Sequence, residues 1–294
     1  MALLSVAADV CGGVVSIWDL GMGARPLAMG EAFVGLADDE NAVLRNPAGL
    51  AWGDGLSILS SAEVRPSTAG CGHLTVCVNN FGLGLHYFDF GDIPETDESG
   101  NVIGAFSYSN MGLIASVGLA MANIPLLSSI QLAEYMAFGI GVKLFSVDTL
   151  EPGDGSGIAT DLSFLLRVDD PWFGSPSLSR LAFGVVAQNL LGSPIAYESG
   201  HHEDWLKRVS LGISVTTLDH FTASLEVGST QTVHVGFEWS PVAVLAVRCG
   251  LKRDGLWMWS LGTGVELDRL AIEYALVLHP YLLTQHRASL RLAW

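Results

Sequence analysis

The stretch WMWSLGTGVEL, which runs from Trp257 to Leu267, decides the fold. Large apolar side chains occupy positions 257, 259, 261, 265 and 267, and Ser260, Gly262, Gly264 and Glu266 lie between them. Successive side chains of a β-strand point to opposite faces of the sheet. This segment therefore predicts a strand with one apolar face and one face of small or polar residues.

The same alternation recurs along the chain beyond about residue 55. Turn residues such as Asn79-Asn80 and Asp268-Arg269 separate successive segments, so neighbours should pair as antiparallel hairpins. Roughly 240 residues follow position 54, which leaves about 17 for each strand with its connection, enough for a tilted membrane strand of about 9 to 11 residues. The predicted strands number fourteen: 55–63, 70–79, 81–89, 106–121, 133–147, 158–168, 180–189, 205–217, 220–228, 231–240, 242–252, 256–267, 269–278 and 285–294.

The composition resembles that of a membrane protein, although no membrane helix is visible. Apolar residues make up 50% of the chain and charged residues only 15%, whereas about 25% charged residues is usual in soluble domains. A spanning helix needs about 20 predominantly apolar residues. The best candidate, 111–125, is interrupted by Ser116, Gly118 and Asn123. The remaining choices are a soluble β-rich protein and a transmembrane β-barrel, whose apolar residues are dispersed by alternation.

The second face of the strands discriminates between these choices. In a soluble sandwich it would face water and be rich in Lys, Glu and Asp. Here it carries Gly, Ser and Ala with a few charges of both signs, including Gly-x-Gly pairs at 82/84, 139/141 and 262/264. Such residues suit a packed polar lumen in which buried charges must pair. We therefore expect an all-β fold, a 14-stranded antiparallel transmembrane β-barrel, with long outer loops at 89–105, 147–157 and 189–205.

The carboxy terminus supports this prediction. From His286 the chain alternates Ala288, Leu290, Leu292 and Trp294 with polar residues, and it ends on an aromatic side chain. This is the usual signal by which barrel-insertion machinery recognises its clients. We expect the outer membrane of a diderm bacterium as the location, with outer-membrane lipid and that machinery as partners.

Other function classes find little support. The formal net charge of −16 argues against binding nucleic acid through a basic patch. No catalytic signature appears, so we expect no enzymatic activity. The four cysteines form no CxxC pair, and His201-His202-Glu203-Asp204 lacks the spacing of a metal site, so neither a metal nor a cofactor is expected. Residues 1–15 resemble the remnant of a signal peptide or a flexible terminus.

Residues 16–54 have a different pattern from the barrel that we expect over 55–294. The period of two disappears, and either Asp38 or Asp39 can cap a short helix that runs through Arg45. Asn46-Pro47 supplies a second cap, with proline at the first helical position. The segment therefore predicts two short helical turns.

This segment resembles the amino-terminal segment of the FadL-like outer-membrane family, and within it the PorV/PorQ branch. The matching residues are 23–33 (GARPLAMGEAF), 37–39 (ADD) and 46–50 (NPAGL), with further matches at 93–109, 188–190 and 286–290. The resemblance implies a 14-stranded barrel whose amino-terminal segment folds back as a hatch inside the lumen. It also implies passage of fatty-acid-like apolar molecules or, as in PorV-type members, a role as a partner of a protein-secretion system.

Both readings remain open, and each has candidate residues. For passage of a hydrophobic ligand we expect pocket-lining side chains from the hatch, with Asn46 and Pro47 setting its bend. A lumen charge network should anchor the hatch, with Glu266, Glu273, Arg287 and Arg291 facing one another across the closing seam. The candidate pocket residues are Met22, Leu27, Met29, Phe33 and Leu36, and the candidate network is Arg25, Asp38, Asp39, Arg45, Glu238, Arg248, Glu266, Glu273, Arg287 and Arg291.

Overall fold

A computed structural model describes residues 17–64, 69–150, 152–169, 177–218, 220–281 and 284–294. Fourteen long strands dominate it, and a fifteenth of two residues, β8 (His202–Glu203), pairs only with the end of β7. The long strands are β1 (Leu56–Val64), β2 (Ala69–Val78), β3 (Phe81–Thr96), β4 (Val102–Ala120), β5 (Met136–Asp148), β6 (Gly155–Asp169), β7 (Leu178–Tyr197), β9 (Arg208–Thr217), β10 (Phe221–Gly228), β11 (Val233–Val242), β12 (Leu245–Asp254), β13 (Leu256–Leu267), β14 (Leu270–Leu278) and β15 (Gln285–Ala293).

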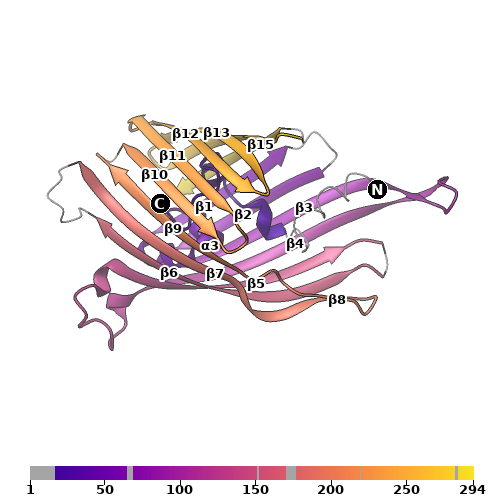
Figure 1. The fold of residues 1–294 in the computed structure, drawn as a ribbon, viewed down its shortest axis with the longest axis horizontal. Coiled ribbons are helices and arrows are strands. Elements are labelled where there is room, and N and C mark those ends of the chain that lie inside the picture. The colour runs from indigo at the N-terminus through magenta and orange to yellow at the C-terminus, as the bar shows by residue number, and fades with distance from the viewer. Residues whose placement is uncertain (1–16, 65–68, 151, 170–176, 219, 282–283) are drawn as a thin grey trace.

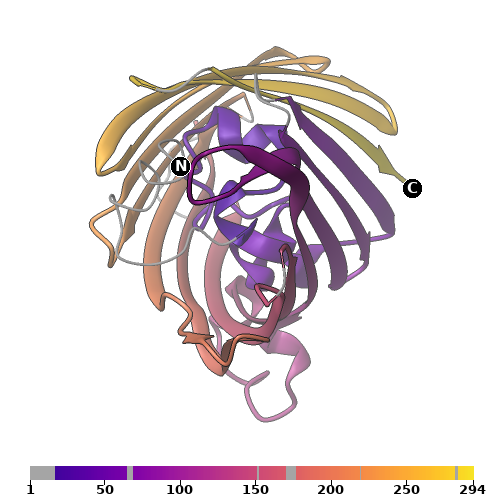
Figure 2. The same cartoon turned by 90° about the vertical axis from the view of Figure 1, so that its right-hand side faces the viewer.

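These fourteen strands close into one antiparallel barrel (Figures 1 and 2). Each long strand pairs with the next along the chain, and β7 pairs with β9. The first and last strands complete the circle, in a register that runs from Ser57 opposite Ala293 to Val64 opposite His286. The predicted fold class is confirmed, and each predicted strand overlaps an observed one.

Two of the predicted outer loops, 89–105 and 189–205, are shorter than predicted because the strands continue into them, whereas the connection 149–154 lies within the predicted loop 147–157. β3 and β4 form a hairpin whose turn spans only 97–101, and β7 continues to Tyr197. The polar character of 89–105 indicated a loop. However, among the described residues β2 pairs with β3 only as far as Phe90, so Pro94 lies on an edge of the sheet, where a strand tolerates proline. A register shift between Phe90 and Ile93 accommodates the extra residues.

The apolar face of the strands lies on the outside of the barrel. Along β13, Trp257, Trp259 and Leu261 are 50%, 60% and 50% exposed, whereas Ser260 between them is 3% exposed. A monomeric soluble protein rarely exposes so continuous an apolar surface, and a closed barrel is one of the two structures that can span a bilayer. The chain is therefore a transmembrane β-barrel, and its apolar outer face suits contact with lipid.

Residues 17–54, called the lumen segment below, occupy the interior of the barrel (Figure 2). The segment contains four short helical elements, where two were predicted. No described helix is long and apolar enough to cross a membrane. The four elements are η1 (Ile17–Leu20), α2 (Ala24–Ala28), α3 (Ala42–Arg45) and η2 (Pro47–Trp52); two further turns, η3 (Met121–Asn123) and η4 (Ala133–Tyr135), connect β4 to β5.

One of the two predicted caps is present. The Asn46 side chain accepts a hydrogen bond from the Ala48 N–H at the start of η2, with Pro47 at the first helical position. Neither Asp38 nor Asp39 caps α3, because Asn41 is its N-cap residue and makes no side-chain capping bond. Asp39 instead accepts from the backbone and side-chain N–H groups of Asn41 and so fixes the turn before the helix.

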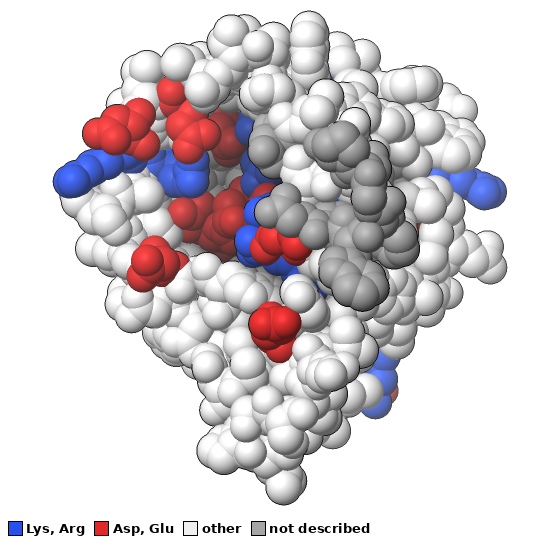
Figure 3. Space-filling model, turned by 90° about the vertical axis from the view of Figure 1, so that its left-hand side faces the viewer, with Lys and Arg blue, Asp and Glu red and all other residues white. Residues whose placement is uncertain are grey.

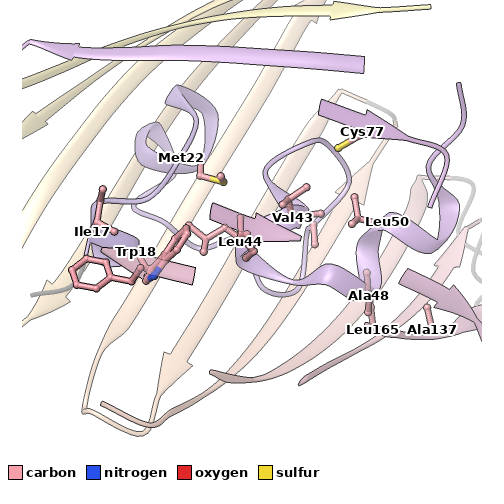
Figure 4. Packing of buried hydrophobic residues seen from close by; sticks show 14 of the residues in the cluster. Ile17, Trp18, Met22, Val43, Leu44, Ala48, Leu50, Cys77, Ala137 and Leu165 are labelled. Atoms are coloured by element: carbon pink, nitrogen blue, oxygen red, sulfur yellow. The ribbon is translucent and has the colours of Figure 1, made fainter. Parts of the chain in front are cut away.

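The core lies between the lumen segment and the inner side of the wall (Figure 4). Its largest cluster joins Met22, Val43 and Leu50 of the segment to Cys77 and Leu165 of the wall. The predicted glycine pairs face this interior: a Cβ at Gly139 would lie 2.1 Å from the Ala48 nitrogen, and one at Gly262 would lie 2.4 Å from the Ala28 Cβ. Glycine is needed because the segment backbone touches the wall.

Leu261→Arg tests the lipid-facing assignment against Leu267→Arg on the same strand. Leu261 lies in the middle of β13 and Leu267 at its end, and both are about half exposed. Arginine at mid-bilayer depth costs about 2–4 kcal/mol, and near an interface about 0–1 kcal/mol. Guanidinium unfolding in lipid vesicles should show the larger loss for Leu261→Arg. Equal losses at the two positions would contradict the assignment.

Candidate functional site

Arg25 of α2 is the centre of the charge network in the lumen. Its Nε and Nη2 donate to the two carboxylate oxygens of Glu238 at 2.8 and 2.9 Å. Its Nη1 donates to Asp38 at 2.7 Å and to Asp39 at 2.9 Å. Burial lowers the pKa of Arg25, but Asp38, Glu238 and Asp39 outweigh burial and raise it well above its usual value. One guanidinium thus joins two turns of the lumen segment to the β11 wall.

The network continues along the wall through Arg248 of β12. The Arg248 Nε donates to Glu238 at 2.5 Å, and its Nη2 lies 3.1 Å from Glu273 of β14. Arg180 of β7 reaches Asp38 at 3.3 Å from the opposite side. The structure therefore brings together Arg25, Asp38, Asp39, Glu238, Arg248 and Glu273 of the predicted set.

The two arginines of the closing seam make their ion pairs outside this cluster, although Arg291 interacts electrostatically with Asp39 and Glu273. Arg291 pairs with Glu266 at 2.5 Å, and Arg287 pairs with Glu63 of β1. Arg287 and Arg291 are four residues apart on one strand, hence about 13 Å, too far for a common cluster. Glu63, which sequence reasoning missed, is the direct partner of Arg287 in the β1–β15 register. Pairing the first predicted strand with the last would have found it.

Glu31 forms a second attachment that the sequence did not reveal. Its carboxylate lies 2.5 Å from the Lys252 Nζ on β12 and 3.4 Å from Arg45 of α3. Burial alone would raise the pKa of Glu31, but Lys252 and Arg45 lower it well below its usual value, so this carboxylate is ionised. Glu31 has φ of 65° and follows Gly30 at 61°, so a left-handed turn carries the ion pair. A residue with a Cβ is strained in that conformation.

The predicted pocket residues enter three separate clusters of the described residues. All five are buried, at 6% exposure or less. Met22 belongs to the largest cluster, Leu27 packs with Val277 of β14, and Met29, Phe33 and Leu36 pack together. Asn46 donates from Nδ2 to the Val34 carbonyl at 2.7 Å and so joins two parts of the segment near its bend at Pro47.

A cavity of about 100 Å³ lies between the lumen segment and strands β12 to β15. The apolar part of its lining is Leu20, Leu27, Met258 and Val277. Glu31 and Lys252 line it as well, so the ion pair at the left-handed turn borders the cavity. Leu27 is the predicted pocket residue that lines it.

The end of the barrel that carries Trp294 is called the terminal end below, and the opposite end, with turn 97–101, is called the hairpin end. A second cavity, of about 230 Å³, lies at the terminal end. The terminal end is hollowed, and acidic and basic side chains gather in the hollow (Figure 3). Burial and the neighbouring Asp39 raise the pKa of Glu40, one of its lining carboxyls. The lining includes Asp38, Asp39, Glu40, Leu50, Trp52, Asp54, Cys77, Arg167 and Arg291.

Arg25→Gln should loosen the lumen segment, because three carboxylates would lose their shared cation. Removing one partner of a buried ion pair costs about 3–5 kcal/mol, and Arg25 is 13% exposed. The loss should be smaller than additive in Arg25→Gln/Glu238→Gln, with a coupling energy of about 0.5–3 kcal/mol in denaturant unfolding. Arg253→Gln, on an exposed arginine above Trp257, is the matched control and should lose about 1 kcal/mol or less. Strictly additive losses of unfolding free energy in the double variant would contradict the central role of Arg25 in the network.

Comparisons with known proteins show likeness at the level of fold. No family model and no curated protein sequence matches the chain. The Pseudomonas putida toluene transporter TodX superposes with a TM-score of 0.59 at 12% identity, covering 92% of this chain and 96% of that one. A TodX mutant described as a monoaromatic hydrocarbon channel gives 0.57 at 12% identity, covering 92% and 97%. A Pseudomonas aeruginosa FadL homologue gives 0.49 at 12%, covering 92% and 97%. The chain is thus an outer-membrane barrel that shares the TodX fold.

Proposed function

We propose that the protein carries apolar small molecules across the outer membrane, with the lumen segment acting as a hatch. The observation that supports this most is the cavity between the segment and the wall. Leu20 and Leu27 belong to the segment, whereas Met258 and Val277 belong to the wall. A molecule in this cavity would touch the barrel wall and the lumen segment at once, so its binding free energy can change the position of the segment.

The size of the cavity indicates how such a ligand would be held. At about 100 Å³ it is smaller than an engineered 150 Å³ cavity that accepts benzene. A compact hydrocarbon, or the end of a longer fatty-acid-like chain, would fill it and press on the Gly30–Glu31 turn. The shared fold with a toluene transporter supports an apolar cargo.

The attachments of the segment suit a hatch that opens and closes. They are ion pairs and hydrogen bonds, such as Gly30 N–H to Ser260 and Phe33 N–H to Glu226, rather than a covalent link. The turn at Glu31 holds a residue in a left-handed conformation, which costs about 1–2 kcal/mol. Release of this strain when the turn shifts would offset part of the cost of breaking the Glu31–Lys252 pair.

We infer the orientation of the barrel from the extensions of β3, β4 and β7 at the hairpin end, although the longest described connection, 121–135, lies at the terminal end. Bacterial barrels keep short turns on the periplasmic side and longer segments outside. Accordingly we place the hairpin end outside and the terminal end, with Trp294 and the acidic cavity, in the periplasm. The 100 Å³ cavity, near η1 and Lys252, then lies toward the outside, and the 230 Å³ cavity lies where a ligand would leave.

A second candidate is a PorV/PorQ-like partner of a secretion system, and the β3–β4 hairpin favours it. Among the described residues, the two strands pair only with each other beyond Phe90 and Ser109. Val102 and Ile103 are 68% and 63% exposed. Open edges of this kind accept an added strand from another chain. Val102→Lys/Ile103→Lys should abolish capture of a secreted partner under this reading and leave uptake of small molecules unchanged.

Met258→Trp should block the proposed passage, because the larger ring fills the cavity. We expect the rate of uptake of radiolabelled toluene and oleate by cells to fall at least tenfold. Met111→Trp, on a lipid-facing residue that is 52% exposed, is the matched control and should transport at the wild-type rate. Wild-type uptake no faster than that of cells without the protein would defeat the proposal.

A further inference from the structure

Two histidines of the wall lie stacked under the first turn of the lumen segment. His73 of β2 and His86 of β3 are direct cross-strand partners, with ring centroids 5.1 Å apart and planes inclined by 18°. Their exposures are 6% and 0%. The Trp18 ring of η1 meets His86 edge-on at 5.9 Å. Figure 4 shows Trp18 beside Ile17 in the core cluster that also holds Met22.

The pair is almost fully buried and lies beside a fixed cation. Arg287 of β15 interacts electrostatically with both histidines, and its cation is already shared with Glu63 of β1. Lys143 of β5 lies 5.8 Å from the Trp18 ring and is paired with Asp161 at 2.6 Å. Among the described residues, the His73 Nε2 has no hydrogen-bond partner. From η1 itself, the charged group is Asp19, which pairs with Arg208.

The same turn closes two cavities at the hairpin end. Asp19 and Leu20 line the 100 Å³ cavity. Trp18 and Asp19 line a third cavity, of about 30 Å³, which Trp205 and Arg208 also line. Arg287 holds the turn in place by donating to the Leu20 carbonyl at 2.7 Å and to the Met22 carbonyl at 2.9 Å. If residues 17–22 left the wall, the two cavities would join and the imidazoles would meet water.

We propose that His73 and His86 form a proton-sensitive latch that releases residues 17–22 from the wall on acidification. This inference rests on the proposed function, in which the lumen segment is a hatch, and it names the regulation of that hatch. When the turn is seated the rings are neutral. When it is released they are hydrated, and each can take a proton near the ordinary histidine pKa of about 6.5.

The sign and size of the effect follow from proton linkage. The released state binds more protons than the seated state, so a fall in pH favours release. Between pH 7.5 and pH 5.0, one histidine that titrates only in the released state shifts the equilibrium about 30-fold, and two shift it about 1000-fold. The proton here acts as the ligand that favours the open hatch.

The test follows the turn itself and not transport. A nitroxide at Leu20→Cys, in a background where Cys11 and Cys249 are serine, reports the mobility of η1 by electron paramagnetic resonance in detergent or lipid. We expect the ratio of mobile to immobile label to rise about 1000-fold between pH 7.5 and pH 5.0. His73→Gln and His86→Gln singly should each leave about a 30-fold rise, and the double variant should show almost none.

His201→Gln, on an exposed outer turn, is the matched control and should respond as the wild type does. An immobile label at both pH values in the wild type would overturn the latch, and so would an undiminished response in the single variants. The experiments distinguish failure of the latch from failure of the proposed function. A label that responds in a protein without uptake supports the latch and rejects transport, whereas uptake with an immobile label does the reverse.

Discussion

The structure depends on one constraint: inside a bilayer every backbone N–H and C=O must be paired within the protein. A sheet satisfies this only if its first and last strands meet, as β1 and β15 do from Ser57–Ala293 to Val64–His286. Closure then fixes the two faces. The outside must be apolar, as Trp257, Trp259 and Leu261 are, and the inside can carry the polar and small residues. The lumen segment occupies this interior.

Side chains of the barrel wall hold the lumen segment by hydrogen bonds to its backbone. Its N–H groups donate to wall side chains, as Gly30 does to Ser260 and Ala48 to Ser163, and glycines such as Gly250 and Gly139 let the two backbones approach. Buried ion pairs centred on Arg25 and Glu31 add specificity, because breaking one partner costs far more than the pair contributes. Polar and ionic attachments of this kind fix a single seated position, and under the proposed function a competing charge, a proton or an apolar ligand would release it.

Much of the barrel could be predicted from sequence, because a period of two is visible in every strand and a lumen-facing glycine such as Gly262 stands out against it. The hairpin beyond Phe90 could not, since Gly91 and Pro94 have the chemistry of a loop and only the free edge of β3 makes them tolerable in a strand. The partners of Arg25 were among the candidates, but Glu63, Glu31 and Lys252 were missed. Their pairing depends on the register of closure and on a left-handed turn. The grouping of Met22, Leu27 and Phe33 into separate clusters was equally hidden, because it follows from the path of short turns through the lumen.

Hydrogen exchange of the backbone amides in residues 23–49, measured by mass spectrometry on the reconstituted protein at neutral pH, tests the central claim most directly. That claim is that the chain's own amino-terminal part is packed inside the barrel and bonded to its wall. Amides such as those of Gly30, Phe33, Val34 and Ala48 should then exchange as slowly as those in the middle of β13. Complete exchange of residues 23–49 within seconds, beside protected strands, would show a barrel whose lumen is not occupied by this segment.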